Sequence, residues 1–259
     1  MSKFSAVILC MSVLTPTVAS YADDAPAPPP PPEGVWTGKG QAGYLSSQGN
    51  TDAKSANAAL DMALTDGLWK HELHLGGLYG ENTGIVSAER FDAKWQSDYS
   101  ITQDLFAFGG LRYSHDLFSG FDYQETATTG VGYKFLDTDS IKLSAQVGAG
   151  YRRELPELLI KNSVGEVVQR IKQPEESGAI ATAGIDYSQA LSSTTTVTDK
   201  LLVETGSQNT LLTNALALSV KMTTKLALSL GYGLQDNTNP PAGLKKVDTI
   251  ETVNLVYSF

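Results

Sequence analysis

The stretch "RFDAKWQSDY" (residues 90–99) alternates polar and apolar side chains with a period of two. One parity carries Arg90, Asp92, Lys94, Gln96 and Asp98, and the other carries aromatic or small residues. Because successive side chains of a strand point to opposite faces, this pattern predicts a β-strand with one polar and one apolar face. In a soluble protein the apolar face would pack on a core. In an outer-membrane barrel it would face lipid, and the polar face would line the interior.

The composition narrows the class of protein. The chain has 259 residues, is 41% hydrophobic and carries a formal net charge of −9. It has no apolar run of the ~18 residues that a membrane-spanning helix needs. The acidic balance argues against nucleic acid as a partner. We expect neither a metal nor a cofactor, because no spacing typical of metal ligands appears and Cys10 is the only cysteine.

The N-terminal region has the pattern of an exported protein. Lys3 precedes an apolar stretch, and small residues around Ala22 form a cleavage site, so residues 1–22 are predicted to be a signal peptide. The following "DDAPAPPPPPEG" (23–34) predicts an extended, proline-rich periplasmic tether. We expect this tether to act as a spacer, with contact to the cell wall or a partner as the alternative. The barrel would then occupy residues 35–259.

About twelve segments after Val35 repeat the alternation, within the even-numbered range of bacterial barrels. They lie near 35–46, 55–66, 68–80, 89–100, 104–115, 123–135, 141–153, 178–190, 196–206, 210–222, 225–236 and 247–259. Each is close to the ~9–11 residues that a tilted strand needs to cross a bilayer. The expected fold is therefore all-β, a transmembrane antiparallel barrel.

The connections between these segments alternate in length. Short ones occur at 66–67, 101–104, 136–140, 192–196 and 223–225, and long ones at 46–54, 81–89, 116–122, 154–177 and 236–246. Only "GSQN" (206–209) breaks the long set. Short periplasmic turns and longer extracellular loops are typical of outer-membrane barrels. The 154–177 stretch is predicted to be a hairpin beyond the membrane that either protects the rim or acts as a gate at the mouth.

Aromatic residues on the apolar parity fall at both ends of the predicted strands. The short-turn set is Trp36, Trp69, Tyr99, Tyr133, Phe135, Tyr187, Tyr257 and Phe259, and the long-loop set is Tyr44, Tyr79, Phe91, Tyr113, Tyr123, Tyr151 and Tyr232. Aliphatic residues and alanine lie between them. Two aromatic girdles around an aliphatic band match the two interfaces of a bilayer. The apolar face is therefore expected to point outward, into lipid.

Two motifs resemble a known family. The stretch "GYLSSQGNTDAKSANAALDM" (43–62) and the terminal "VNLVYSF" (253–259) are similar to sequences of the YdiY-like family of salt-induced outer-membrane proteins. The resemblance covers nearly the whole chain after Val35. It implies an outer-membrane barrel linked to osmotic or salt stress, of uncharacterised biochemical function. Tyr257 and Phe259 resemble the terminal signal that the barrel-assembly machinery binds.

The polar parity gathers charges of both signs inside the predicted barrel. The candidates for a lumen that selects ions or solutes are Arg90, Asp92, Lys94, Asp98, Lys70, Glu72, His74 and Arg112. One interpretation is a narrow aqueous pore, and the function it predicts is a small, weakly selective channel or envelope-stress barrel. The other is a lumen closed by charges that pair across strands. We favour the pore.

Two further functions remain as alternatives. A closed structural barrel in the outer membrane could bind lipopolysaccharide or a partner through its loops. A rim hydrolase could use His115, but Ser114 and Asp116 are its sequence neighbours and point to the opposite face. We therefore expect no enzyme activity. The expected partners are outer-membrane lipid, lipopolysaccharide, the barrel-assembly machinery and small ions or solutes.

Overall fold

The computed structural model describes residues 34–48, 52–163 and 166–259. The predicted signal peptide (1–22) and all of the predicted tether (23–34) except Gly34 lie outside the described residues. No helix among the described residues is long and apolar enough to span a membrane. These residues fold instead into strands joined by turns and loops.

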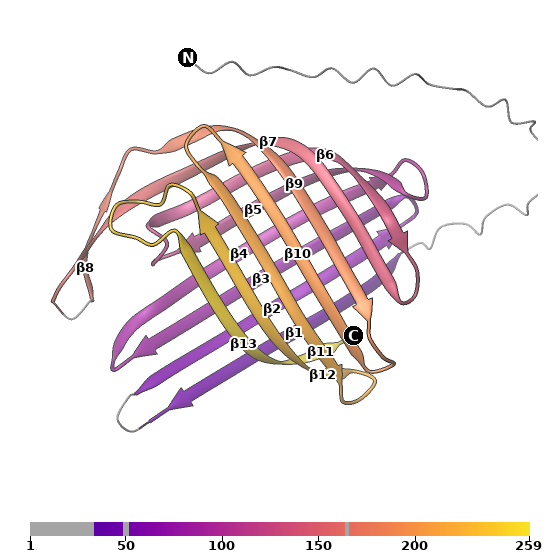
Figure 1. The fold of residues 1–259 in the computed structure, drawn as a ribbon, viewed down its shortest axis with the longest axis horizontal. Coiled ribbons are helices and arrows are strands. Elements are labelled where there is room, and N and C mark those ends of the chain that lie inside the picture. Colours follow the sequence, from indigo (N-terminus) through magenta and orange to yellow (C-terminus); the bar gives the residue numbers. More distant parts are fainter. Residues whose placement is uncertain (1–33, 49–51, 164–165) are drawn as a thin grey trace, which may run out of the picture. The chain divides into compact units, whose positions relative to one another are not determined.

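The strands form a closed antiparallel barrel (Figure 1). They are β1 (Val35–Ser47), β2 (Ala53–Asp66), β3 (Trp69–Asn82), β4 (Ile85–Ser100), β5 (Leu105–Asp116), β6 (Phe121–Asp137), β7 (Ile141–Lys161), β8 (Val167–Lys172), β9 (Glu176–Ala190), β10 (Thr195–Gly206), β11 (Thr210–Lys221), β12 (Leu226–Asn237) and β13 (Val247–Ser258). Their order in the sheet is β6-β5-β4-β3-β2-β1-β13-β12-β11-β10-β9-β7-β8, and pairing of β6 with β7 closes the ring. Since β8 pairs only with β7, twelve of the described strands make up the barrel, as predicted.

The 154–177 segment is a β-hairpin, as predicted, but it is more regular than the expected loop. Strand β7 continues unbroken from the barrel wall to Lys161, and β8 pairs with its end from Glu157↔Lys172 onward. The β8 arm projects from the barrel in Figure 1. The prediction that the strand ends near residue 153 is therefore wrong, because the chain can keep its β-conformation wherever a partner strand supplies the ladder hydrogen bonds.

The apolar parity faces outward, which confirms the predicted arrangement of a transmembrane barrel. Large hydrophobic side chains that remain exposed include Trp36, Trp69, Tyr99, Tyr133, Phe135, Tyr257 and Phe259 near the short turns, and Tyr44, Tyr79, Phe91, Tyr113, Tyr151 and Tyr232 toward the long loops. Leu73, Val147, Leu228 and Leu230 are exposed between them. Such a surface suits a lipid environment, because in water this large apolar area would stay exposed to solvent at a cost in free energy.

The barrel interior is not uniformly polar. Phe106 and Phe108 of β5 point inward and are among the few buried hydrophobic residues, at 7% and 4% exposed. Their rings lie over Gly130, Gly132 and Gly148 of β6 and β7, where any Cβ would collide with a ring or the backbone. The glycines were expected to relieve crowding. The aromatic filling that they accommodate was not predicted.

The seam between the first and last strands is short. Strand β1 pairs with β2 over thirteen positions, from Val35↔Thr65 to Ser47↔Ala53, but with β13 over only four, from Lys39↔Ser258 to Ala42↔Leu255. Beyond the short seam, Asn57 donates a 2.7 Å hydrogen bond to Asn254 across the closing strands. Closure thus depends strongly on the last residues of the chain.

Candidate functional site: a charged lumen

The half of the lumen near the short turns is lined by charged side chains that water can reach. Alternate positions of β1 to β4, β9 and β10 supply them. Lys39, Lys70 and Lys200 are 55%, 48% and 69% exposed, although all three side chains point into a closed barrel. Asp61, Glu72, His74, Asp92 and Asp186 are also partly exposed there. This half of the lumen therefore has room for water.

Most of these charges are paired with a neighbour on the same or the adjacent strand. Lys39 lies 3.6 Å from Asp61, Lys70 lies 2.8 Å from Glu72, and Lys200 lies 3.3 Å from Asp186. Such pairs hold the side chains against the wall, but partly hydrated pairs contribute little to stability.

His74 sits between two carboxylates. Its Nδ1 lies 2.7 Å from Asp61 Oδ1, and its Nε2 lies 3.1 Å from Asp92 Oδ2. Gly76, the register partner of Asp92, leaves space for that carboxylate, since a Cβ there would lie 2.8 Å from Asp92 Oδ1. Because a carboxylate accepts at each ring nitrogen, both nitrogens can donate only in the imidazolium form. The arrangement therefore favours a charged His74.

Two pairs of side chains, which we call chords, meet across the lumen and separate β5 and β6 from its hydrated side. Arg112 of β5 forms an ion pair with Glu204 of β10, with three strands between them around the ring. Gln96 of β4 donates 3.4 Å to Gln146 of β7, and 2.9 Å to Asp98 on its own strand. The passage therefore lies to one side of the barrel axis.

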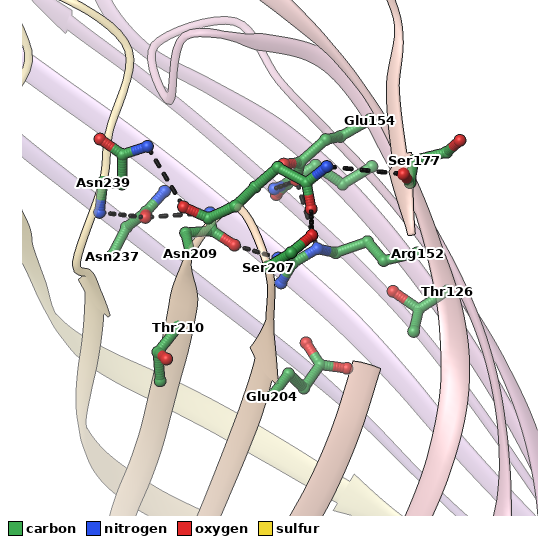
Figure 2. Close-up of polar contacts among 12 residues, drawn as sticks. Thr126, Arg152, Glu154, Ser177, Glu204, Ser207, Asn209, Thr210, Asn237 and Asn239 are labelled. Carbon is green, nitrogen blue, oxygen red and sulfur yellow. Dashed lines mark hydrogen bonds and ion pairs between the residues drawn. The ribbon is translucent and has the colours of Figure 1, made fainter. Parts of the chain in front are cut away.

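The half of the lumen near the long loops is closed by a buried polar network. Arg152 Nη2 donates to Asn209 Oδ1, and Asn209 donates 3.1 Å to Asn237, which links β7 to β12 (Figure 2). Arg152 also lies 3.5 Å from Glu154, both side chains being 4% exposed. Gln124 of β6 donates 2.9 Å to the same carboxylate. Arg152 Nη1 is buried without a hydrogen-bond partner among the described residues, so the network fills this half of the lumen but leaves one of its polar atoms unsatisfied.

A loop crosses the mouth above this network. The β12–β13 and β5–β6 connections lie opposite each other, with four strands between them on either side of the ring. Nevertheless Leu244 and Pro241 of the first connection pack on Gly120 of the second. A Cβ at Gly120 would overlap Leu244 Cδ1 and lie 2.9 Å from Pro241 Cγ. We call residues 238–246 the mouth strap.

The β7–β8 hairpin is tied to the same rim. Arg170 donates to Leu117 O, lies 3.6 Å from Glu157, and has its guanidinium 5.6 Å from the Phe118 ring centroid. Lys172 forms a 2.7 Å ion pair with Asp122. The hairpin thus adds to the covering of the rim.

A second cluster fixes the base of the hairpin outside the barrel. Arg153 donates 2.7 Å, and Tyr123 donates 2.8 Å, to Glu175 Oε2. These hydrogen bonds, that from Arg153 foremost, hold the pKa of the Glu175 carboxyl below its usual value.

The predicted selectivity residues lie in three places. Lys70, Glu72, His74, Asp92, Lys94 and Asp98 line the hydrated half, whereas Arg112 belongs to a chord. Arg90 lies apart from them, paired at 2.6 Å with Asp116 near the long-loop rim. Arg90 is four residues nearer to the long-loop end of β4 than Lys94, which places it beside Asp116 at that rim.

The remaining predicted residues lie at the barrel ends. His115 Nδ1 contacts Asp122 O rather than Ser114. Tyr257 and Phe259 face outward beside each other at the short-turn end, with ring centroids 6.4 Å apart. Sequence reasoning missed Phe106, Phe108 and the mouth strap. The parity that Phe106 and Phe108 share with Arg112 was a usable signal for their inward orientation.

Comparison with known proteins identifies the family. The description "Protein of unknown function, DUF481" matches residues 40–259. The chain belongs to the DUF481 family. It is similar to "Uncharacterized protein YdiY" of Escherichia coli (strain K12), with 24% identity over 229 residues, covering 86% of this chain and 83% of that protein. This confirms the resemblance to the YdiY-like family.

Solved structures with a similar arrangement include both channels and autotransporter domains, all of low sequence identity to this DUF481 chain. The NanC porin has a TM-score of 0.47 and 10% identity, covering 87% of this chain and 99% of its own. The COG4313 outer membrane channel from Pseudomonas putida F1 has a TM-score of 0.49 and 10% identity, covering 88% and 96%. Both TM-scores are below 0.5, so the barrel assignment rests on the strand pairing of this chain.

Proposed function

We propose that this protein is an outer-membrane channel of a Gram-negative-type cell envelope that conducts small ions or hydrophilic solutes. The observation that carries the proposal is the exposure of the lumenal charges. Lys39, Lys70 and Lys200 would be covered if neighbouring side chains filled the barrel, yet about half or more of each side chain is open to water. Partly exposed charges of both signs on facing walls of the lumen are suited to a weakly selective passage.

The long-loop end of the barrel determines whether this channel is open or closed. The Arg152 network and the mouth strap cover the outer mouth, while the hydrated half reaches the short-turn end. The arrangement is that of a vestibule open toward the periplasm and closed toward the outside. Conduction then requires the strap to move, and we expect brief openings rather than a constantly open pore.

Single-channel recording tests the proposal. The mature protein would be refolded into planar lipid bilayers, and currents recorded under a salt gradient. We expect discrete steps whose reversal potential moves toward the cation-selective direction for Lys94→Met and the anion-selective direction for Asp98→Asn. Variants of the outward residues Phe135 and Tyr133 are matched controls and should leave the reversal potential unchanged. A folded barrel without current steps would overturn the proposal.

A second candidate is favoured by the covered mouth. A closed barrel whose loops bind lipopolysaccharide or a partner would need the same Arg152 network and hairpin, but no movement of the strap. Folded protein that shows no conductance, with or without the strap contact between Leu244 and Gly120, would favour this candidate. The link to salt or osmotic stress and recognition by the barrel-assembly machinery stay predictions from the family resemblance.

A further inference from the structure

We propose that Lys94 is the anion-binding group of a solute subsite in the lumen, and that this subsite takes the carboxylate of a small hydrophilic acid. The inference rests on the proposed channel function and adds a ligand class to it.

Lys94 has no partner among the described residues, unlike most of the lumenal lysines and arginines; Lys221, on the inward parity at the short-turn end of β11, is another lysine without an ion pair. Lys39, Lys70, Arg90, Arg112, Lys134, Lys142, Arg152 and Lys200 each form an ion pair with an aspartate or glutamate. Lys94 forms no ion pair and no hydrogen bond with any residue that the structure describes. An ammonium needs acceptors when water is partly excluded, so Lys94 is free to bind an anion from the lumen.

The charges around Lys94 are paired with one another. His74 and Arg112 are its register partners on β3 and β5. The positive charge of Lys200, across the lumen on β10, also acts on it. The acids nearby are engaged elsewhere, Glu72 with Lys70 and Asp186 with Lys200. Because these cations each have a carboxylate beside them, the positive charge left without an ion pair at this place in the lumen is that of Lys94 itself.

A small cavity lies beside Lys94. It measures about 40 Å³ and is lined by Lys94, Gln96, Arg112, Thr126, Gln146 and Thr182 among others, over the Phe108 ring and Gly110. The carboxylate of Glu204 also lines it and is held in its ion pair with Arg112. That volume holds about three water molecules, at roughly 10–15 Å³ each, which matches a carboxylate group rather than a whole sugar. The amides and hydroxyls around it can donate to the carboxylate and to nearby hydroxyl groups of the solute.

Channel block by gluconate tests the subsite, with glucose and glucosamine as neutral and cationic counterparts of similar size. We expect gluconate to block the current of the natural protein at lower concentration than either counterpart. Losing one charge-assisted contact should weaken the block about tenfold or more in Lys94→Met. Lys70→Met removes the same charge from a paired lumenal lysine, and we expect it to weaken the block less than about threefold, as exposed pairs contribute little.

The two proposals fail in different ways. NMR titration of the detergent-solubilised barrel with gluconate should shift the backbone amides of Lys94, Gln96 and Gln146, and these shifts should vanish in Lys94→Met. Such shifts without any current in bilayers would support the subsite and overturn the channel. Current steps without gluconate shifts, equal block by gluconate and glucose, or equal weakening by Lys94→Met and Lys70→Met would overturn the subsite.

Discussion

The terminal residue Phe259 and Gly38 of β1 exchange two backbone hydrogen bonds. Phe259 N donates 3.0 Å to Gly38 O, and Gly38 N donates 3.0 Å to Phe259 O. The Phe259 ring occupies the space where a Gly38 side chain would lie, since a Cβ there would come within 3.2 Å of Phe259 Cδ2 and closer to two other ring atoms. The last residue of the chain thus closes the barrel.

Gly38→Leu should therefore impair closure. We expect a lower yield of folded barrel and faster unfolding, measured by the heat-dependent migration of the protein in detergent gels. Gly40→Leu, on the same strand, is the matched control, because a Cβ at Gly40 would have no other atom within 4 Å. Equal yields from the two variants would show that the Phe259 contact does not limit closure.

Phe108→Ala should widen the lumen while weakening the barrel. The 4% exposed ring packs on Gly130 and Gly148, and deleting a buried phenylalanine side chain costs about 3–5 kcal/mol. We expect a larger single-channel conductance and a lower urea midpoint of unfolding. Phe135→Ala, at a lipid-facing ring, should leave the conductance as it is. An unchanged conductance in Phe108→Ala would mean that the ring does not border the passage.

The Arg112–Glu204 chord should show strong coupling in a double-mutant cycle. Glu204 is 3% exposed, and removing one member of a buried ion pair leaves the other charge uncompensated, at a cost of about 3–5 kcal/mol. We expect Arg112→Met and Glu204→Met each to lower the free energy of unfolding in urea. The double variant should recover much of that loss. Additive losses would contradict a direct interaction between the two side chains.

Leu244→Ser should loosen the mouth strap. The leucine packs on Gly120 at the opposite rim, and the serine would remove most of that apolar contact. In bilayer recordings we expect more frequent openings with an unchanged step size. Ala242→Ser, at an exposed position of the same segment, serves as the control. If opening frequency is the same in all three proteins, the strap does not gate the mouth.

Acid should release the base of the hairpin. The pKa of Glu175 is lowered by its hydrogen bonds from Arg153 and Tyr123. Its contribution is therefore fully present above the ordinary carboxyl pKa of about 4.3 and is lost as pH falls through the lower folded value. A spin label at Val168 should become more mobile between pH 5 and pH 2. Glu175→Gln should already be more mobile at pH 7, and its further change in acid should be smaller than that of the natural protein, because only the Lys172–Asp122 and Arg170–Glu157 ion pairs remain to be lost.

The strand pattern and its orientation follow from local sequence. In the stretch from Arg90 to Tyr99 the alternation of charged and aromatic residues is a property of neighbours, and the period of a strand is always two. The girdle positions follow from the distance between short turn and long loop, because bilayer thickness sets strand length. For these reasons the number of barrel strands, their direction and their lipid-facing side could be predicted without knowing which strands pair.

The shape of the lumen depended on relations that no local pattern contains. Arg112 and Glu204 are 92 residues apart in the chain and meet only because the sheet closes with a particular register and tilt. The same closure brings Leu244 to Gly120 and leaves Lys94 without a partner while its neighbours are paired. Side-chain alternation assigns a residue to the inside of a barrel. Only the three-dimensional register decides which inward charges neutralise one another and which remain for a solute, because an ion pair forms only where the two side chains reach each other across the lumen.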